Sequence, residues 1–279
     1  MPLLEVRDEI DVASPVLVLA ISGWVDGGLV ATQVGEYLTG LGKLVAVFSP
    51  DDIYDYQSHR PSLELADGAT EAIEFPTLSV HTASIGGVDL VVTTGAEPNF
   101  KWQGVATELA GLAGALGATR VVSVGAVPAM VAHSRPTPVI ITSTDPLLEA
   151  AGMPADRLVV PAALTNVVAH RVASANSIPD VGFWAQVPHY VSGAYWPGVD
   201  AVITRMASHL GMTPDLGVVR ARALDLITRL DEAVSASPDA QRFIMELEAS
   251  TPGFAVDDSG RLGDEIEEYL RSLGEDDPD

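Results

Sequence analysis

Short, almost purely apolar stretches alternate with longer amphipathic stretches along most of the chain. Apolar runs of about four to eight residues are typical of strands buried on both faces, and apolar residues at helical spacing indicate helices. The expected strands are residues 16–21, 44–48, 90–94, 120–127, 139–142 and 181–185. The expected helices between them are residues 29–38, 103–116, 164–175 and 199–210. This order predicts an α/β fold with a mostly parallel sheet covered by helices on both faces.

One stretch interrupts the alternation. It contains three short segments of strand character, residues 62–65, 72–75 and 78–83, with Asp67-Gly68 and Pro76 between them. Asp-Gly between two such segments is a turn signal for antiparallel strands. We therefore expect an antiparallel insert or an edge of the sheet in this part of the chain.

The pattern changes after Gly211. Helical spacing recurs in residues 216–234, 238–247 and 262–273, without strands between them. We expect two regions, an α/β core over residues 1–212 and an acidic C-terminal helical extension over residues 213–279. These helices either pack on the core or form a separate arm, and periodicity is compatible with both arrangements.

Composition and charge narrow the class of protein. The 279 residues are 47% hydrophobic and 19% charged, which is typical of a folded globular chain. The formal net charge is −23, so a nucleic-acid partner is not expected, because a surface this acidic repels phosphate. Residues 231–279 hold 15 acidic and 3 basic residues, a net charge of −12 in the C-terminal part alone. This acidic region is either a solvated face or a docking surface for a basic partner.

The cellular compartment is predicted from two further observations. The apolar run near the start, residues 16–21, is too short to cross a bilayer and follows several acidic residues, unlike a signal peptide. The chain contains no cysteine, which excludes disulfides, thiolate catalysis and cysteine-ligated zinc. We expect a cytoplasmic protein with no membrane partner.

Polar and aromatic residues follow five of the expected strands. In parallel α/β sheets, ligands bind beyond the carboxyl ends of the strands. The candidate ligand or partner cleft therefore comprises the residues at these positions, namely Trp24, Asp26, His59, Arg60, Glu97, Trp102, His133, Arg135, His189 and Tyr190.

Each of these residues also has a simpler interpretation. Asp26 is followed by glycines and is expected to cap a helix, with Trp24 packing beneath it. The same loop could bind phosphate through its backbone N–H groups, but the dinucleotide pattern G-x-G-x-x-G and the Walker lysine are both missing. Arg60 and Arg135, each before a proline, would either clamp an anion or, as we favour, bond to Glu97 or Asp26 and pin the loops together.

Catalytic and metal signatures are missing from the sequence. His59, His133 and His189 show none of the usual metal-ligand spacings, so we predict no metal site and no cofactor. There is no G-x-S-x-G nucleophile elbow, and Ser22 and Ser123 have no recognisable base nearby. We therefore predict no catalytic residue.

Five strand-end segments, taken in order, are similar to those of a known family. They are residues 22–28 (Ser-Gly-Trp-Val-Asp-Gly-Gly), 56–61, 95–102, 133–136 and 188–190. This combination resembles the proteasome assembly chaperone 2 family, in its actinobacterial branch, over residues 2–212. The resemblance implies a phosphorylase/hydrolase-like core, assembly into homo-oligomers, specifically trimers, and, for eukaryotic and archaeal members, binding to proteasome α-subunits.

Two hypotheses follow for the function. The first is a non-enzymatic scaffold or assembly chaperone that self-associates and binds protein partners, with proteasome subunits among the candidates. The second is an enzyme or sensor for a nucleoside-like or anionic small molecule. In that case Arg60 or Arg135 would hold the anion, Glu97 or Asp26 would accept a hydrogen bond, and Trp24 or Trp102 would stack on a ring.

Overall fold

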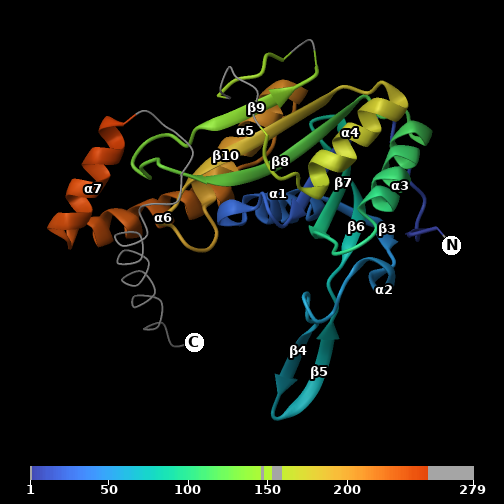
Figure 1. Cartoon of the computed structure of the whole chain (residues 1–279), viewed down its shortest axis with the longest axis horizontal. Coiled ribbons are helices and arrows are strands. Elements are labelled where there is room, and N and C mark those ends of the chain that lie inside the picture. The colour runs from blue at the N-terminus through green and yellow to red at the C-terminus, as the bar shows by residue number, and fades with distance from the viewer. Residues whose placement is uncertain (1, 146–147, 153–158, 251–279) are drawn as a thin grey trace.

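A sheet of eight strands forms the centre of the molecule (Figure 1). The computed structural model describes residues 2–145, 148–152 and 159–250. In spatial order the strands are β1 (Leu4–Val6), β3 (Gly42–Phe48), β6 (Leu78–Ile85), β7 (Val88–Ala96), β2 (Val16–Ser22), β8 (Arg120–Ala129), β10 (Asp180–Pro188) and β9 (Val139–Ser143). The four central strands β7, β2, β8 and β10 run parallel, and the other neighbours pair antiparallel. The predicted α/β class is confirmed, with the parallel strands at the centre of a mixed sheet.

Helices cover both faces of this sheet. They are α1 (Val30–Thr39), α2 (Pro50–Ile53), α3 (Trp102–Ala115), α4 (Leu164–Asn176), α5 (Trp196–Leu210), α6 (Gly217–Ser235) and α7 (Pro238–Ala249). The buried residues of α1, α5, α6 and α7 belong to one hydrophobic cluster, and those of α2, α3 and α4 belong to a second. The two clusters lie on opposite faces of the sheet, so the fold has three layers.

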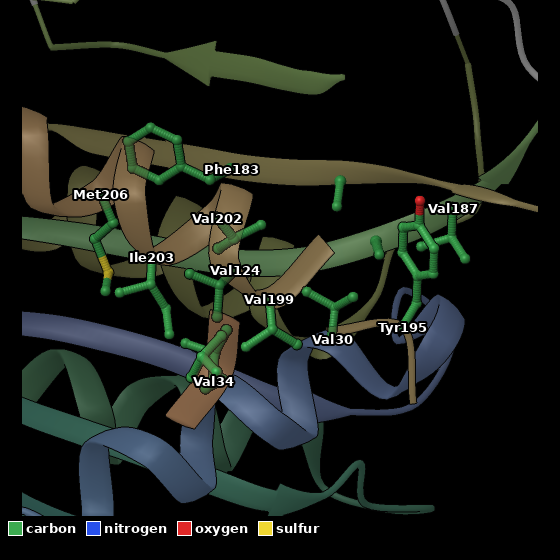
Figure 2. Packing of buried hydrophobic residues seen from close by; sticks show 14 of the residues in the cluster. Val30, Val34, Val124, Phe183, Val187, Tyr195, Val199, Val202, Ile203 and Met206 are labelled. Carbon is green, nitrogen blue, oxygen red and sulfur yellow. The ribbon is translucent and has the colours of Figure 1, made fainter. Parts of the chain in front are cut away.

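Strand β2 shows how the sequence produces this arrangement. Val16, Val18 and Ala20 belong to the first cluster, whereas Leu17 and its alternate neighbours belong to the second. Successive side chains of a strand point to opposite faces, so an uninterrupted apolar run is buried on both sides. Figure 2 shows the first cluster, in which side chains of α1 and α5 pack against β8 and β10.

The C-terminal helices α6 and α7 pack on the core. Val219 and Leu230 of α6 and Ile244 and Leu247 of α7 are buried in the same cluster as the sheet residues. They therefore extend the core cluster and do not form a separate arm. The further helix that we predict over residues 262–273 lies outside the described residues.

The predicted antiparallel insert is present as a hairpin. Strands β4 (Ser62–Ala66) and β5 (Ala69–Glu74) form their own two-stranded sheet, which projects from the body of the molecule (Figure 1). Asp67 and Gly68 both have left-handed φ angles, 51° and 79°, as a tight primed turn requires. The third segment, β6, lies inside the main sheet between β3 and β7. Its alternate residues Leu78 and Val80 are fully buried there, which favours this position over an exposed hairpin.

Two short elements were not predicted, α2 and the edge strand β1. Strand β1 pairs with the second half of β3, from Leu4 opposite Phe48 to Val6 opposite Ala46. Beyond it, Asp8 accepts a hydrogen bond from Lys43 of β3 at 3.0 Å. A three-residue strand with a charged centre carries no periodicity, so sequence patterns miss it.

Candidate functional site

The ends of the four parallel strands place most of the candidate residues at one edge of the sheet. Parallel strands present their carboxyl ends together. Trp24 and Asp26 follow β2, Glu97 follows β7, His133 and Arg135 follow β8, and His189 and Tyr190 follow β10. Seven of the ten candidate residues therefore follow the carboxyl ends of the central strands, and their contacts divide them into groups.

Asp26 is committed to helix α1. Its Oδ1 accepts the backbone N–H of Ala31 at 2.7 Å and that of Thr32 at 3.2 Å, and its Oδ2 accepts the Thr32 hydroxyl at 2.6 Å. Burial raises the pKa of Asp26, and the three hydrogen bonds oppose this shift. The carboxyl group thus satisfies N–H groups in the first turn of α1, as the helix-cap interpretation predicts.

Glu97 joins the ends of β2 and β7 to helix α4. Its Oε1 accepts the backbone N–H of Leu164, at the start of α4, at 2.6 Å. Its side chain lies so close to Gly23 that a Cβ there would be 2.7 Å from the Glu97 Cβ. Trp24, the next residue, is 67% exposed, so the expectation that it packs beneath the helix is wrong.

His59 and Trp102 are held by neighbours beyond β7. The Nδ1 of His59 lies 2.8 Å from Oδ1 of Asn99, and Asn99 also accepts the backbone N–H of Asp55. Trp102 donates its indole N–H to the carbonyl of Pro98 at 2.6 Å. Both side chains therefore fix the loop between β7 and α3, while Arg60 is exposed.

A second group surrounds His133 at the ends of β8 and β10. The Tyr190 hydroxyl accepts the backbone N–H of His133 at 2.8 Å and lies 2.7 Å from its Nδ1. In the second contact either group can donate, depending on which ring nitrogen of His133 carries the proton. Nε2 is 3.3 Å from Oδ1 of Asp231 on α6, which is an ion-pair distance. Burial lowers the pKa of His133, and the carboxylates of Asp231 and Glu248 oppose this shift.

The same group reaches helix α7. Ser134 donates to Oε1 of Glu248 at 2.5 Å, and the Arg135 guanidinium lies 3.8 Å from Oε2. The expectation that Arg135 pairs with Glu97 or Asp26 is wrong, because its ion-pair partner is Glu248 of α7. The rings of His189 and Phe243 contact edge to face at 5.8 Å. Loops at the sheet edge and the C-terminal helices are therefore connected.

Sequence reasoning missed the partners Asn99, Asp231, Phe243 and Glu248. Asp231 and Glu248 belong to acidic helices for which the sequence predicts a solvent-exposed face. No local sequence pattern distinguishes these two carboxylates from the other acidic residues around them. Within the described ranges, no three side chains of metal-ligating type come together. No helix in those ranges has the length and apolarity needed to cross a bilayer.

Comparison with known proteins identifies the family. Residues 20–234 match the model of the PAC2 family. The chain belongs to the PAC2 family. This confirms the resemblance carried by the strand-end segments. No curated protein matches the chain.

Several solved structures share the fold over most of the chain. A Mycobacterium tuberculosis protein of unknown function, Rv2714, is 27% identical with a TM-score of 0.82, covering 89% of this chain and 90% of its own. The M. tuberculosis proteasome-assembly chaperone homologue Rv2125 is 27% identical with a TM-score of 0.74, covering 82% and 99%. A PAC2 family protein from Streptomyces avermitilis is 28% identical with a TM-score of 0.71, covering 82% and 99%.

Proposed function

We propose that this PAC2 family chain is a cytoplasmic, non-enzymatic scaffold of the assembly-chaperone type, which forms homotrimers and binds proteasome subunits. One observation carries the proposal. The titratable groups at the sheet edge that could act on a substrate are used within the chain, Asp26 by α1, Glu97 by α4 and His133 by Tyr190 and Asp231. A general acid or base must instead reach the proton that it transfers. The relative Rv2125, a proteasome-assembly chaperone homologue, supports the class of partner.

The hairpin β4–β5 supports self-association. Leu63 and Ile73 pair directly across its two strands, and Phe75 follows on the same face. Leu63 is 54% exposed, Ile73 56% and Phe75 48%. A two-stranded hairpin is marginally stable in water without a surface to pack on. We therefore place the contact between copies of the chain on this apolar face.

The oligomeric state tests this part of the proposal. Light scattering after size exclusion should give three times the chain mass for the native protein, and the chain mass for the double variant L63E/I73E. The control is E64Q/E74Q, on the opposite face of the same hairpin, which should remain trimeric. A monomeric native protein, or a trimeric L63E/I73E variant, would contradict the proposed interface.

The partner is tested separately. Purified proteasome α-subunits from the same host, immobilised on a sensor surface, should bind the native chain saturably. Absence of binding by both the native chain and its trimer-deficient variant would overturn the proteasome role and leave the oligomer result intact.

The small-molecule alternative has one supporting observation. Trp24 and Arg60 are exposed in loops that follow β2 and α2. An aromatic ring and a guanidinium are the groups that a nucleoside-like or an anionic ligand would need. A thermal-shift screen with nucleosides, nucleotides and phosphate tests this, because a ligand that binds the folded state raises Tm. A rise that is lost in Arg60→Gln would favour the alternative over the scaffold.

A further inference from the structure

A polar hollow lies on the α4 face of the sheet, away from the carboxyl edge. Gly182 of β10 pairs with Ser123 of β8 on one side and with Thr142 of β9 on the other. The neighbours of Gly182, Val181 and Phe183, belong to the cluster beneath α5, so Gly182 is turned to the opposite face. The absence of a side chain on Gly182 leaves space at the centre of these three strands.

Trp184 lies flat over this space. A Cβ at Gly182 would be 2.5 Å from Nε1 of Trp184, and a Cβ at Gly125 would be 3.0 Å from its Cε3 and Cζ3. The indole therefore spans β10 to β8 and rests on two glycines, and no other residue would leave room for it. Its N–H is donated to the Thr142 hydroxyl at 3.0 Å. Trp184 is only 8% exposed, so the indole offers a ligand a small part of its ring, and its polar atom is already satisfied.

A cavity of about 220 Å³ opens beside this indole. Its walls include Asn166 and His170 of α4, Ser123 of β8 and Asp180 at the start of β10. Asn166 and His170 are four residues apart and so share one side of the helix. The Oδ1 of Asn166 accepts the N–H of Ala163, which leaves the amide NH₂ group as a donor.

The donors and acceptors around the indole define the ligand chemistry. Oδ1 of Asp180 accepts the Thr144 hydroxyl at 2.7 Å, so its other carboxylate oxygen is the acceptor for a ligand. Asn166 supplies donors, and the Ser123 hydroxyl and the His170 ring can each do both. Such a mixture matches hydroxyl groups, which donate and accept at once, better than a fully charged ligand. The exposed part of the Trp184 ring is apolar and matches the apolar C–H face of a sugar ring. At about 220 Å³ the cavity is below the usual range of about 300–1,000 Å³ for drug-sized ligands, so it fits a single ring.

We propose that this cavity is a binding site for a monosaccharide-sized polyhydroxylated ring, stacked on Trp184 and hydrogen-bonded by Asp180, Asn166 and His170. The site is independent of the proposed scaffold function, since it lies on the α4 face and uses none of the residues at the carboxyl edge. With few contacts to a small ligand, the dissociation constant is expected on the order of 1 mM.

Fluorine NMR of the full chain labelled with fluorotryptophan tests the proposal. The sequence has 4 tryptophans, so the Trp184 signal is assigned as the one missing in Trp184→Phe. The probes are glucose, galactose, mannose, ribose and myo-inositol, titrated one at a time. At least one of them should shift the Trp184 signal saturably and leave the signal of the exposed Trp24 unchanged.

Two single substitutions in the cavity walls test whether these residues bind the ligand. Asp180→Asn and His170→Ala should each weaken the affinity at least fivefold while Tm stays close to that of the native chain. Trp24→Phe is the matched control and should bind as the native chain does. The proposal is overturned if no probe moves the Trp184 signal, if both wall variants bind unchanged, or if choline moves that signal and no sugar does, since the last result would indicate a cation site.

Discussion

The Tyr190 hydroxyl binds both the backbone nitrogen and the ring Nδ1 of His133, at 2.8 and 2.7 Å. This pair joins the loop after β8 to the end of β10, and Asp231 extends it to α6. The C-terminal helices are thus attached to the core by hydrophobic packing and by this polar group together. The strength of that attachment can be measured.

Replacing Tyr190 with Phe should destabilise the fold. The change removes a buried hydroxyl and leaves the N–H of His133 unpaired, which costs about 1–3 kcal/mol. Urea unfolding of both proteins measures the difference. Tyr37→Phe is the control, because the Tyr37 hydroxyl bonds to the Asp215 carbonyl in an exposed position and should contribute within about 0.5 kcal/mol. Equal losses in the two variants would contradict a special role for Tyr190.

Stability should fall as the solution becomes acidic, in part through His133. Burial lowers the folded-state pKa of His133 below the ordinary value of 6.5, while Asp231 and Glu248 oppose this. The unfolded chain therefore binds the proton more readily, so the stability contribution is complete above 6.5 and is lost as the pH falls toward the folded-state pKa. The free energy of unfolding of His133→Gln should accordingly approach that of the native chain at acidic pH. A gap that widens on acidification would show the opposite sign.

Two glycine-to-alanine changes in helices should have opposite effects. A Cβ on Gly35 of α1 would lie 2.4 Å from the Thr94 hydroxyl and 3.4 Å from the Ala20 Cβ, so Gly35→Ala should cost about 1–3 kcal/mol by overpacking. A Cβ on Gly111 of α3 meets nothing within 4 Å, so Gly111→Ala should stabilise by about 0.5–1 kcal/mol. Thermal unfolding measures both. Stabilisation by both variants would mean that α1 does not lie this close to β2 and β7.

Among the carboxylates that form ion pairs in the described part of the chain, Asp145 should be the most costly to remove. It is 4% exposed, lies 2.5 Å from Nε of Arg120, and has Nε2 of His209 at 3.5 Å. Breaking a buried pair leaves a charge uncompensated and costs about 3–5 kcal/mol, at the lower end here because Arg120 keeps some exposure. Asp225→Ala, which breaks the exposed pair with Arg229, should cost less than about 0.5 kcal/mol. Chemical denaturation of the two variants compares them directly.

Local patterns predict most of the fold because a buried strand or helix needs its apolar residues at a fixed spacing. The run over residues 16–21 corresponds to β2, Val16–Ser22, and the expected helix at 164–175 corresponds to α4, Leu164–Asn176. The cap at Asp26 is equally local, since the residues that it contacts follow within six positions.

The candidate site was harder to predict because its contacts join distant parts of the chain. The Arg135 partner Glu248 lies on α7, and the Tyr190 partner His133 lies on another strand-end loop. Which carboxylate reaches which loop depends on how α6 and α7 pack against the sheet, and this is not encoded in any short pattern. The flat position of Trp184 likewise depends on Gly125, in a neighbouring strand.

Strand β1 forms one edge of the main sheet. An edge strand has unpaired backbone N–H and C=O groups that can pair with a strand of another chain, which leads to aggregation. Here β1 is only three residues long, and the uncovered start of β3 presents Lys43, neutralised by Asp8. A short strand and a charged side chain make a poor template for stacking. Copies of this chain should therefore not pair through this edge of the sheet, even at high protein concentration. Their association then depends on other surfaces.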